Sequence, residues 1–502
     1  MNRLTMSFAA AILCLCNANV FAGDDVKIKR TLKNNMMEVY KITPTSADNL
    51  TEAFSNGVLY GRLRANWFKW DWDQVNYIGE TLINQDNKAL GVGGSLIYKT
   101  APLLGISAGA GLYYADSPFH GMRMNNDMVK YTKAGKDTFS RYNVSTEGTW
   151  AMAVLAQAYA QYDVSKTSFK AGRQIFESFL TKSNDTKMIP NTFEGYTIDS
   201  KELDSTRIRA AYFTAQKLRD HTTFHDLITF KDSEGNRWNN NDDAAVHRGL
   251  SYDNFVAAGQ SPENNLIVAD IRNTSLENLK LDVTYGLVPD VVGSLTAEAN
   301  YKIKFSGGYS LTPGVRYMYQ MDEGGGAIGG SALSGLLAGW KEGDDKRGYS
   351  DPSSLDASLI AARLVFKVDA LKLQAGYSAI ADDADIVAPW RGFPTGGYTR
   401  AMAQYNWFSN TKTTSVEAFY DFSKADVIPG FRMLTRYASQ DFDETKGLPD
   451  SNILHIDMWK KFASLPNFEA KVRIGILYAD EFPSTDKDLS YNEYRFELNY
   501  LF

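Results

Sequence analysis

The sequence predicts an all-β protein, a transmembrane antiparallel β-barrel built from long amphipathic strands. Three observations indicate this fold class. The chain ends on a strand that alternates apolar and polar residues, interior segments repeat that alternation, and no apolar run beyond the N-terminal segment is long enough for a membrane-spanning helix. Because a period of two sends alternate side chains to opposite faces of a strand, these strands must lie between an apolar medium and water.

Residues 1–22 have the features of a cleaved secretory signal. Arg3 gives a short positive segment, an apolar run covers residues 6–15, and Val20-Phe21-Ala22 places small or branched residues where a signal peptidase cleaves. The alternative, a single membrane anchor, requires about 18 or more continuous apolar residues. Asn17 interrupts the run before that length is reached, so we expect a signal peptide.

Both cysteines of the chain, Cys14 and Cys16, lie in this predicted signal. The exported protein therefore cannot depend on disulfides for its stability. Residues 23–50 are charged and contain Pro44, and we expect them to form an N-terminal extension. We assign residues 51–502 to the barrel.

The composition narrows the function class. The chain has 53 Lys and Arg against 59 Asp and Glu, a net charge of -6, which argues against a nucleic-acid partner. Aromatic residues make up 13% of the sequence, while the mean hydropathy is -0.32. A membrane protein of this composition must close its strands into a barrel, because only a closed sheet satisfies backbone hydrogen bonds in lipid.

Three interior segments alternate as the last one does, at residues 59–68, 295–306 and 371–379. Their predicted lipid-facing residues are Leu59, Gly61, Leu63, Ala65 and Trp67; Leu295, Ala297, Ala299, Tyr301, Ile303 and Phe305; and Leu371, Leu373, Ala375, Tyr377 and Ala379. A helix over residues 295–306 would mix Glu298 and Lys302 into its apolar face. Segments of about 9 to 12 residues, tilted by about 45°, span the ~25 Å apolar band of an outer-membrane barrel.

The connections are of two kinds, brief turns and long polar stretches such as residues 234–249 and 322–354. Short periplasmic turns and long extracellular loops are typical of such barrels, and these lengths allow roughly 16 to 20 strands. The closing segment YNEYRFELNYLF ends on Phe502, and we expect it to pair with the first strand. These features predict a protein of the Gram-negative outer membrane, in contact with lipid and lipopolysaccharide and inserted by the outer-membrane assembly machinery.

Particular segments resemble the OprD family of outer-membrane porins. They are TEAFSNGVLYGRLRANWFKWDWD at 51–73, FKAGRQIFESFLTKSNDTKMIPNTFEGYTIDSKEL at 169–203, YDFSKADVIPGFRMLTRYASQDFD at 420–443 and the closing NEYRFELNYLF. APWRGFPTGGYTRAMAQYNW at 388–407 is similar to epsilonproteobacterial members. The resemblance implies a monomeric or trimeric barrel of 18 strands, narrowed by inward-folded loops, through which small and often carboxylate-bearing solutes diffuse along a ladder of arginines.

The resemblance also places the constriction near residues 185–194, with Asp185, Lys187 and Glu194 as candidates. This chain has two departures there. Ile175 and the residues after it replace the proline that follows Gly-Arg-Gln in the family, and Lys187 stands where the family has arginine. A lysine attracts a carboxylate but cannot bind it with a planar, two-pronged donor.

The strand pattern itself predicts which charged residues face the lumen: Arg62, Arg64, Arg207, Arg209, Arg316, Arg363, Arg400, Arg436, Arg473, Arg495, Glu298 and Glu417. One interpretation is a partly basic, water-filled pore with weak anion preference. The other is that these groups pair across strands and hold the wall together.

The sequence gives little support to an enzyme, a cofactor or a metal. His221 and His225 are four residues apart, as zinc ligands on a helix are, but the expected glutamate is missing and the surroundings predict a strand. Two functions remain: a porin for passive diffusion of small solutes, and a surface-binding or adhesion barrel with a plugged lumen. The many inward charged residues favour the porin.

Overall fold

The computed structural model describes residues 29–32, 38–41, 46–73, 76–78, 81–83, 86–126, 129, 138–231, 246–402, 405–481 and 488–502. The predicted signal, residues 1–22, lies outside the described residues. Within the predicted extension, β1 (Lys29–Leu32) pairs with β2 (Glu38–Lys41). Helix α2 (Leu50–Ser55) begins at the last residue of that extension and precedes the first barrel strand.

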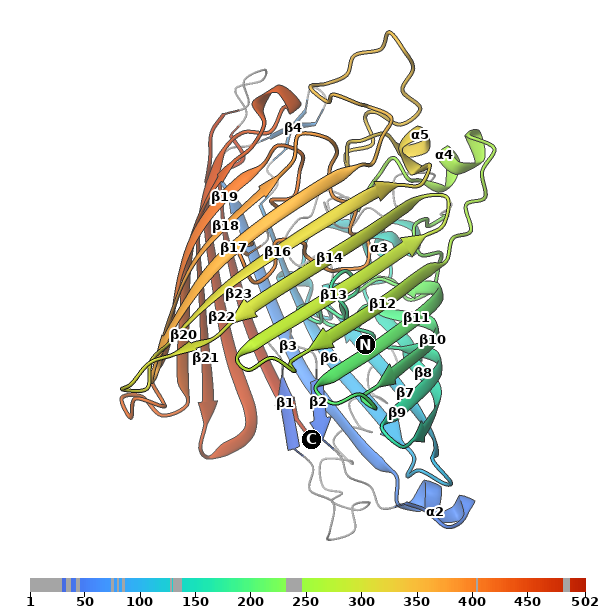
Figure 1. The fold of residues 1–502 in the computed structure, drawn as a ribbon, viewed down its shortest axis with the longest axis vertical. Coiled ribbons are helices and arrows are strands. Elements are labelled where there is room, and N and C mark those ends of the chain that lie inside the picture. The colour runs from blue at the N-terminus through green and yellow to red at the C-terminus, as the bar shows by residue number, and fades with distance from the viewer. Residues whose placement is uncertain are drawn as a thin grey trace.

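The barrel is a closed antiparallel sheet (Figure 1). Its strands are β3 (Val58–Trp72), β6 (Asn87–Lys99), β7 (Ile106–Asp116), β8 (Met152–Val164), β9 (Thr167–Gln174), β10 (Thr192–Ser200), β11 (Thr206–Lys217), β12 (Leu266–Asn273), β13 (Leu279–Val288), β14 (Val292–Tyr301), β15 (Ile303–Lys304), β16 (Ser310–Asp322), β17 (Ala357–Val368), β18 (Leu371–Ile380), β19 (Lys412–Asp421), β20 (Phe431–Asp441), β21 (Ser451–Phe462), β22 (Leu465–Ala479) and β23 (Tyr491–Leu501). Because β15 continues β14 and both pair with β16, the barrel has 18 strands, which confirms the predicted fold.

The other described elements are short. A hairpin of β4 (Asn76–Ile78) and β5 (Thr81–Ile83) follows β3, and helices α3 (Arg141–Glu147), α4 (Tyr252–Ala257) and α5 (Gly325–Gly329) lie in connections. Two 3-10 turns, η1 (His120–Met122) and η5 (Glu444–Lys446), complete the set. In the described part of the chain, no helix is long and apolar enough to cross a membrane.

The last strand closes the barrel, as expected from its alternation. β23 pairs with β3 from Tyr491 opposite Trp72 to Leu501 opposite Arg62. Phe502 extends this pairing, since its backbone N–H donates to the Gly61 carbonyl oxygen and its carbonyl oxygen accepts from the Gly61 N–H, both at 3.1 Å. The C-terminus is therefore held by main-chain hydrogen bonds and does not form a free sheet edge.

The strand faces follow the predicted register. In β14, Leu295 and Tyr301 are 45% and 48% exposed on the outer wall, whereas Thr296 and Asn300 are buried inside. Phe496 lies on the outer face of β23, and Glu497 is buried on the inner face. The outer surface is thus apolar and the lumen polar, the arrangement that lipid outside and water inside require.

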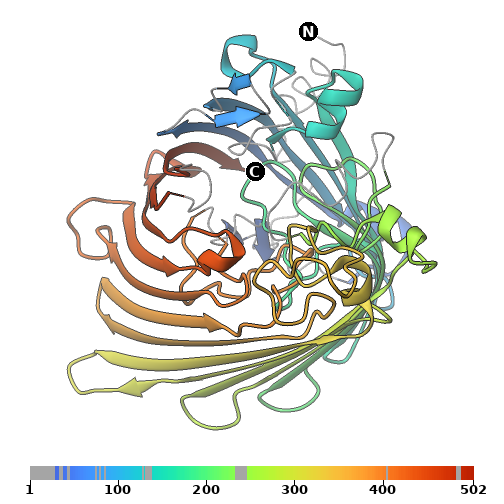
Figure 2. The same cartoon turned by 90° about the horizontal axis from the view of Figure 1, so that it is seen from above.

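Long connections lie at one rim and short turns at the other (Figure 1). Two long connections, residues 175–191 between β9 and β10 and residues 381–411 between β18 and β19, fold back into the barrel. Figure 2 shows loops drawn across the barrel opening. They form much of an internal core, to which Leu180, Trp390, Tyr398 and Trp407 contribute buried side chains.

Candidate functional site

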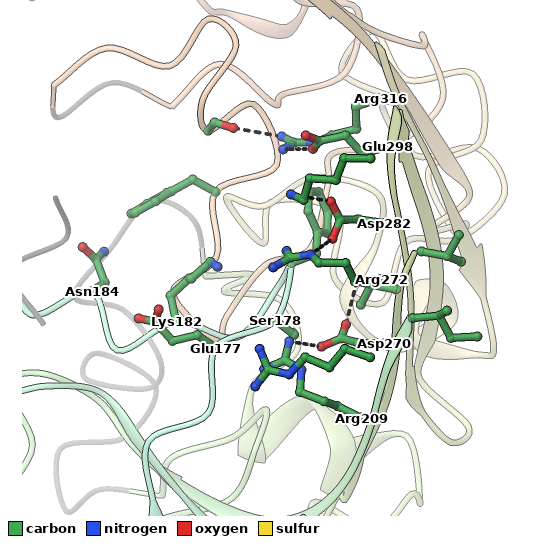
Figure 3. Close-up of a pocket in the computed structure, with 18 residues that line it drawn as sticks. Glu177, Ser178, Lys182, Asn184, Arg209, Asp270, Arg272, Asp282, Glu298 and Arg316 are labelled. Atoms are coloured by element: carbon green, nitrogen blue, oxygen red, sulfur yellow. Dashed lines mark hydrogen bonds and ion pairs between the residues drawn. The ribbon is translucent and has the colours of Figure 1, made fainter. Parts of the chain in front are cut away.

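A cavity of about 720 Å³ lies inside the barrel, between the two inward-folded loops and the wall made by β11 to β14 and β16 (Figure 3). The wall contributes mainly charged side chains. The loop 175–191 contributes Glu177, Lys182 and Asn184 from the opposite side. Phe179 and Phe393 bring one aromatic ring from each loop. The cavity is therefore charged along its wall and partly aromatic along its loops.

The loop 175–191 is held against the first strand by a buried carboxylate. Asp185 is 2% exposed and accepts hydrogen bonds from Arg62 Nη2 at 2.5 Å and Arg64 Nη1 at 2.7 Å. Arg64 also donates from Nε to Glu497 at 2.8 Å. Because β3 presents both arginines inward at i and i+2, the alternation of this strand positions the loop.

The two loops are joined directly to each other. The Lys182 backbone N–H donates to the Trp390 carbonyl oxygen at 2.9 Å, and the Gly392 N–H donates to the Leu180 carbonyl oxygen at 2.7 Å. A Cβ atom on Gly392 would lie 2.3 Å from that oxygen, so only glycine permits this approach. The two loops thus form one structure inside the lumen.

Wall arginines hold the loop 381–411. Arg316 Nη1 donates to the carbonyl oxygens of Pro394 at 2.6 Å and Gly396 at 3.0 Å, and Arg363 Nη1 donates to Gly397 O at 2.9 Å. Both guanidinium groups also pack on the ring of Tyr398, with centroid distances of 4.4 and 4.5 Å. The loop therefore covers the arginines and limits the width of the lumen beside them.

Carboxylates accompany the basic groups along the wall, and they form a sequence of ion pairs (Figure 3). Asp199 accepts from Arg207, and Asp270 accepts from Arg209. Asp282 is shared by Arg272 Nε at 2.5 Å and Lys280 Nζ at 2.7 Å. Glu298 is likewise shared by Arg316 and Arg363. Two of these four carboxylates face two cations each, which leaves a small excess of positive charge.

The remaining predicted lumen residues lie outside this cavity. Arg436 and Lys372 share Glu417, Arg473 donates to Asp457 at 2.7 Å, and Arg495 donates to Glu493 at 2.5 Å. These contacts join neighbouring strands or positions on one strand, as the second interpretation of the inward charges expects. Of the twelve predicted residues, the structure brings Arg207, Arg209, Arg316 and Glu298 to the cavity lining.

Two sequence-based placements were wrong. Arg400 does not belong to a strand; it lies in the loop 381–411 with its guanidinium 3.5 Å from the ring centroid of Phe393. Glu194 does not belong to a loop; it is the third residue of β10 and accepts from Arg173 Nε at 2.8 Å. Arg400 lies within a long connection and Glu194 lies just after one, and in such connections the alternation of strand residues gives no information about position. Asp185 and Lys187 do lie in the loop 175–191, and Lys187 packs its ammonium on the Phe68 ring at 4.0 Å.

Sequence reasoning missed several wall residues, namely Asp199, Asp270, Arg272, Lys280 and Asp282. The same alternation could have found them, because Ile271, Val283 and Leu281 separate them along β12 and β13. It missed Glu177, Lys182, Phe179 and Phe393 for another reason. These residues lie in loops, and no local pattern shows where a loop folds.

The two spaced histidines form a hydrogen-bonded pair. His221 Nδ1 lies 2.9 Å from His225 Nε2 in the connection between β11 and β12, where His221 is buried and His225 is half-buried. Burial lowers the pKa of His225 to about 4, so its ring is neutral at pH 7. In the described ranges, no group of three or more His, Cys, Asp or Glu side chains has the arrangement of a metal site.

Comparison with known proteins identifies a matching family and several solved structures with a similar fold. A family model described as outer membrane porin, OprD family, matches residues 142–501. The fold is similar to Pseudomonas aeruginosa OpdK crystallised with vanillate (12% identity, covering 88% of this chain and 98% of that chain, TM-score 0.65). It is also similar to P. aeruginosa OccK8 (OprE), with 15% identity, coverage of 90% of this chain and 99% of that chain, and a TM-score of 0.66. The third similar structure is Acinetobacter baumannii OccAB1, with 13% identity, coverage of 91% of this chain and 99% of that chain, and a TM-score of 0.67.

The search of curated proteins finds no match. The solved structures share the closed barrel of this chain, and the family model covers most of the chain. The chain belongs to the OprD family of outer-membrane porins, and it forms an outer-membrane channel for small solutes.

Proposed function

We propose that this channel passes small carboxylate-bearing solutes through the cavity between the loops and the β11–β16 wall, with a weak preference for anions. The observation that carries the proposal is the shared carboxylate: Arg272 and Lys280 face the cavity with Asp282 between them. Their side chains are 50% and 42% exposed, so their charge reaches the lumen. In a confined, low-dielectric pore a small excess charge acts over a longer distance than on an open surface.

The lining suits a carboxylate with an apolar part. The cations can attract the anionic end, while Phe179 and Phe393 offer rings to an apolar or aromatic end. Vanillate, present in the OpdK crystal, is a solute of this kind. Family membership and fold support a channel rather than an enzyme.

The test is the reversal potential of single channels in a planar bilayer under a salt gradient. Arg272→Gln with Lys280→Gln should move the selectivity toward cations, most strongly at low salt, where screening is weakest. The matched control is Lys346→Gln with Arg347→Gln, which removes the same charge from an exposed stretch of the connection between β16 and β17. A wild-type channel that prefers cations at low salt would contradict the proposal.

We further propose that the protein works as a monomer or a homotrimer, as its membership of the OprD family suggests. Native mass spectrometry of the detergent-extracted protein tests this, and a dimer would contradict it.

The segment 388–407 supports an epsilonproteobacterial member. Equal similarity of that segment to porins from other bacterial classes would argue against this origin. Outer-membrane lipid, lipopolysaccharide and the assembly machinery are the expected partners.

A further inference from the structure

The short helix before the first strand exposes two large apolar side chains. In α2, Leu50 is 69% exposed and Phe54 is 61% exposed. The two residues are four positions apart, so they share one face of the helix. Exposed apolar side chains that cluster on one face indicate an interaction surface.

This helix is fixed in orientation. The Asn49 side chain accepts a hydrogen bond from the Glu52 N–H at 3.0 Å, and the Glu52 carboxylate accepts one from the Asp48 N–H at 2.9 Å. These two hydrogen bonds cap the N-terminus of the helix. Ala53 is buried, and its carbonyl oxygen accepts from the Ala101 N–H at 2.8 Å. Tyr98 Oη donates to the Phe54 carbonyl oxygen at 2.5 Å. Because Ala53 faces the turn between β6 and β7, Leu50 and Phe54 cannot turn toward it.

The exposed face continues the lipid-facing wall of the barrel. The turn that holds α2 joins β6 to β7. It contains Leu104, which is 88% exposed, and leads into Ile106, the first residue of β7, which is 59% exposed. A Cβ atom on Gly105, between them, would lie 3.2 Å from the Tyr162 ring. Ile106 and Tyr162 in turn line a groove of about 480 Å³ on the outer wall, in which nearly all of the exposed surface is apolar.

The same groove contains the aromatic residues of this rim. Phe169 and Tyr196 line it with Tyr162; Tyr162 and Phe169 lie at the short-turn ends of β8 and β9, and Tyr196 lies further up the wall, in the middle of β10. Aromatic residues in this position mark the membrane–water interface of outer-membrane barrels. Figure 1 shows α2 beyond the barrel wall, next to the ends of these strands.

We propose that α2 rests on the inner leaflet of the outer membrane, with Leu50 and Phe54 inserted at the boundary between phospholipid headgroups and acyl chains. The helix contains no basic residue, and its one acidic side chain is used in the cap. Its affinity therefore comes from apolar burial and does not need anionic lipid. The contact anchors the start of β3, the strand to which β23 closes.

The test uses the full-length chain with Cys14→Ser and Cys16→Ser, reconstituted in phosphatidylcholine vesicles. Single cysteines at Leu50 and Phe54 carry an environment-sensitive fluorophore. The matched control is Ser55→Cys, an exposed position on another face of α2, and Ile106→Cys is the lipid-facing reference. Heat-modifiable migration on a gel verifies that each variant is folded.

We expect the labels at Leu50 and Phe54 to show a blue-shifted emission and quenching by brominated acyl chains, as at Ile106, and the label at Ser55 to be quenched by aqueous iodide. Iodide quenching of the Leu50 and Phe54 labels equal to that at Ser55 would overturn the proposal. That result would mean that this face of α2 is exposed to water and does not insert into the lipid. As an independent measurement that avoids a bulky dye, spin labels at the same sites should be more accessible to oxygen than to a water-soluble nickel complex, and the opposite order would also overturn it.

Discussion

At the scale of single residues, Glu298 connects the charge of the channel to the position of a loop. Its carboxylate accepts from Arg316 Nε at 2.9 Å and from Asn300 Nδ2 at 2.8 Å, and it lies 3.3 Å from Arg363 Nη2. The same two arginines hold the loop 381–411 through its carbonyl groups. One carboxylate thus orients both donors that fix the loop.

We predict that Glu298→Gln makes the channel more anion-selective, because it removes the only carboxylate seen to pair with Arg316 in the described chain. Loss of hydrogen bonds between charged groups should also lower the free energy of unfolding by about 1.5–3 kcal/mol. The reversal potential and denaturant unfolding in detergent measure the two effects. Asp369→Asn is a suitable control, since it removes a carboxylate from an exposed pair with Lys424 in a short turn. A shift toward cations would contradict the assignment.

At the scale of elements, one buried acid links two long extracellular connections. Asp385, in the loop 381–411, accepts from the Leu333 N–H at 2.9 Å and from Tyr349 Oη at 3.0 Å, both in the connection between β16 and β17. It also accepts from the Ser409 N–H at 2.7 Å. Burial raises the pKa of Asp385 from 3.8 to about 6, although these donors and nearby Lys446 oppose the shift.

This raised pKa predicts a pH dependence of the loop structure. Because the pKa in the folded state lies above the unfolded value, the stabilisation is fully present below pH 4 and is lost as the pH rises through about 6. The change is on the order of 3 kcal/mol. After correction for the intrinsic, base-catalysed exchange rate, the protection of residues 331–350 against hydrogen exchange should therefore be lower at pH 7 than at pH 5. Asp385→Asn cannot ionise, and persistence of the same pH dependence in that variant would show that another group is responsible.

At the scale of the whole molecule, closure depends on the last residues of the chain. Phe502 makes two backbone hydrogen bonds with Gly61, and Tyr500 stands opposite Leu63 on β3. We predict that deletion of Phe502, or Tyr500→Ser with Phe502→Ser, lowers the amount of heat-modifiable protein in the outer membrane. The deletion shortens the seam between β23 and β3, and the serine substitutions remove the lipid-facing aromatic side chains of the closing strand. Phe462→Ser removes an exposed aromatic ring at the end of β21 and serves as control. Equal levels of folded protein in all variants would contradict a special role of the C-terminus.

The sequence by itself determined the barrel wall. Lipid outside and water inside impose a period of two on every spanning strand, so the faces of residues 295–301 and of the closing strand could be read from local order alone. The same rule predicted that Arg62, Arg316 and Glu298 face inward, and the structure places them on the inner side of the wall. This rule applies because each residue of a spanning strand faces either lipid or the lumen, whichever residues it pairs with.

The tertiary structure decided the site. Asp185 meets Arg64 across 121 residues of chain, and Arg64 meets Glu497 across 433, distances over which no local pattern extends. The folding of residues 175–191 and 381–411 into the lumen depends on such contacts, and so does the place of Arg400. The strand pattern could say that a charge faces the lumen. Only the folded loops decide which charges are paired and covered and which ones face a cavity, because burial and pairing are set by segments that are distant in sequence.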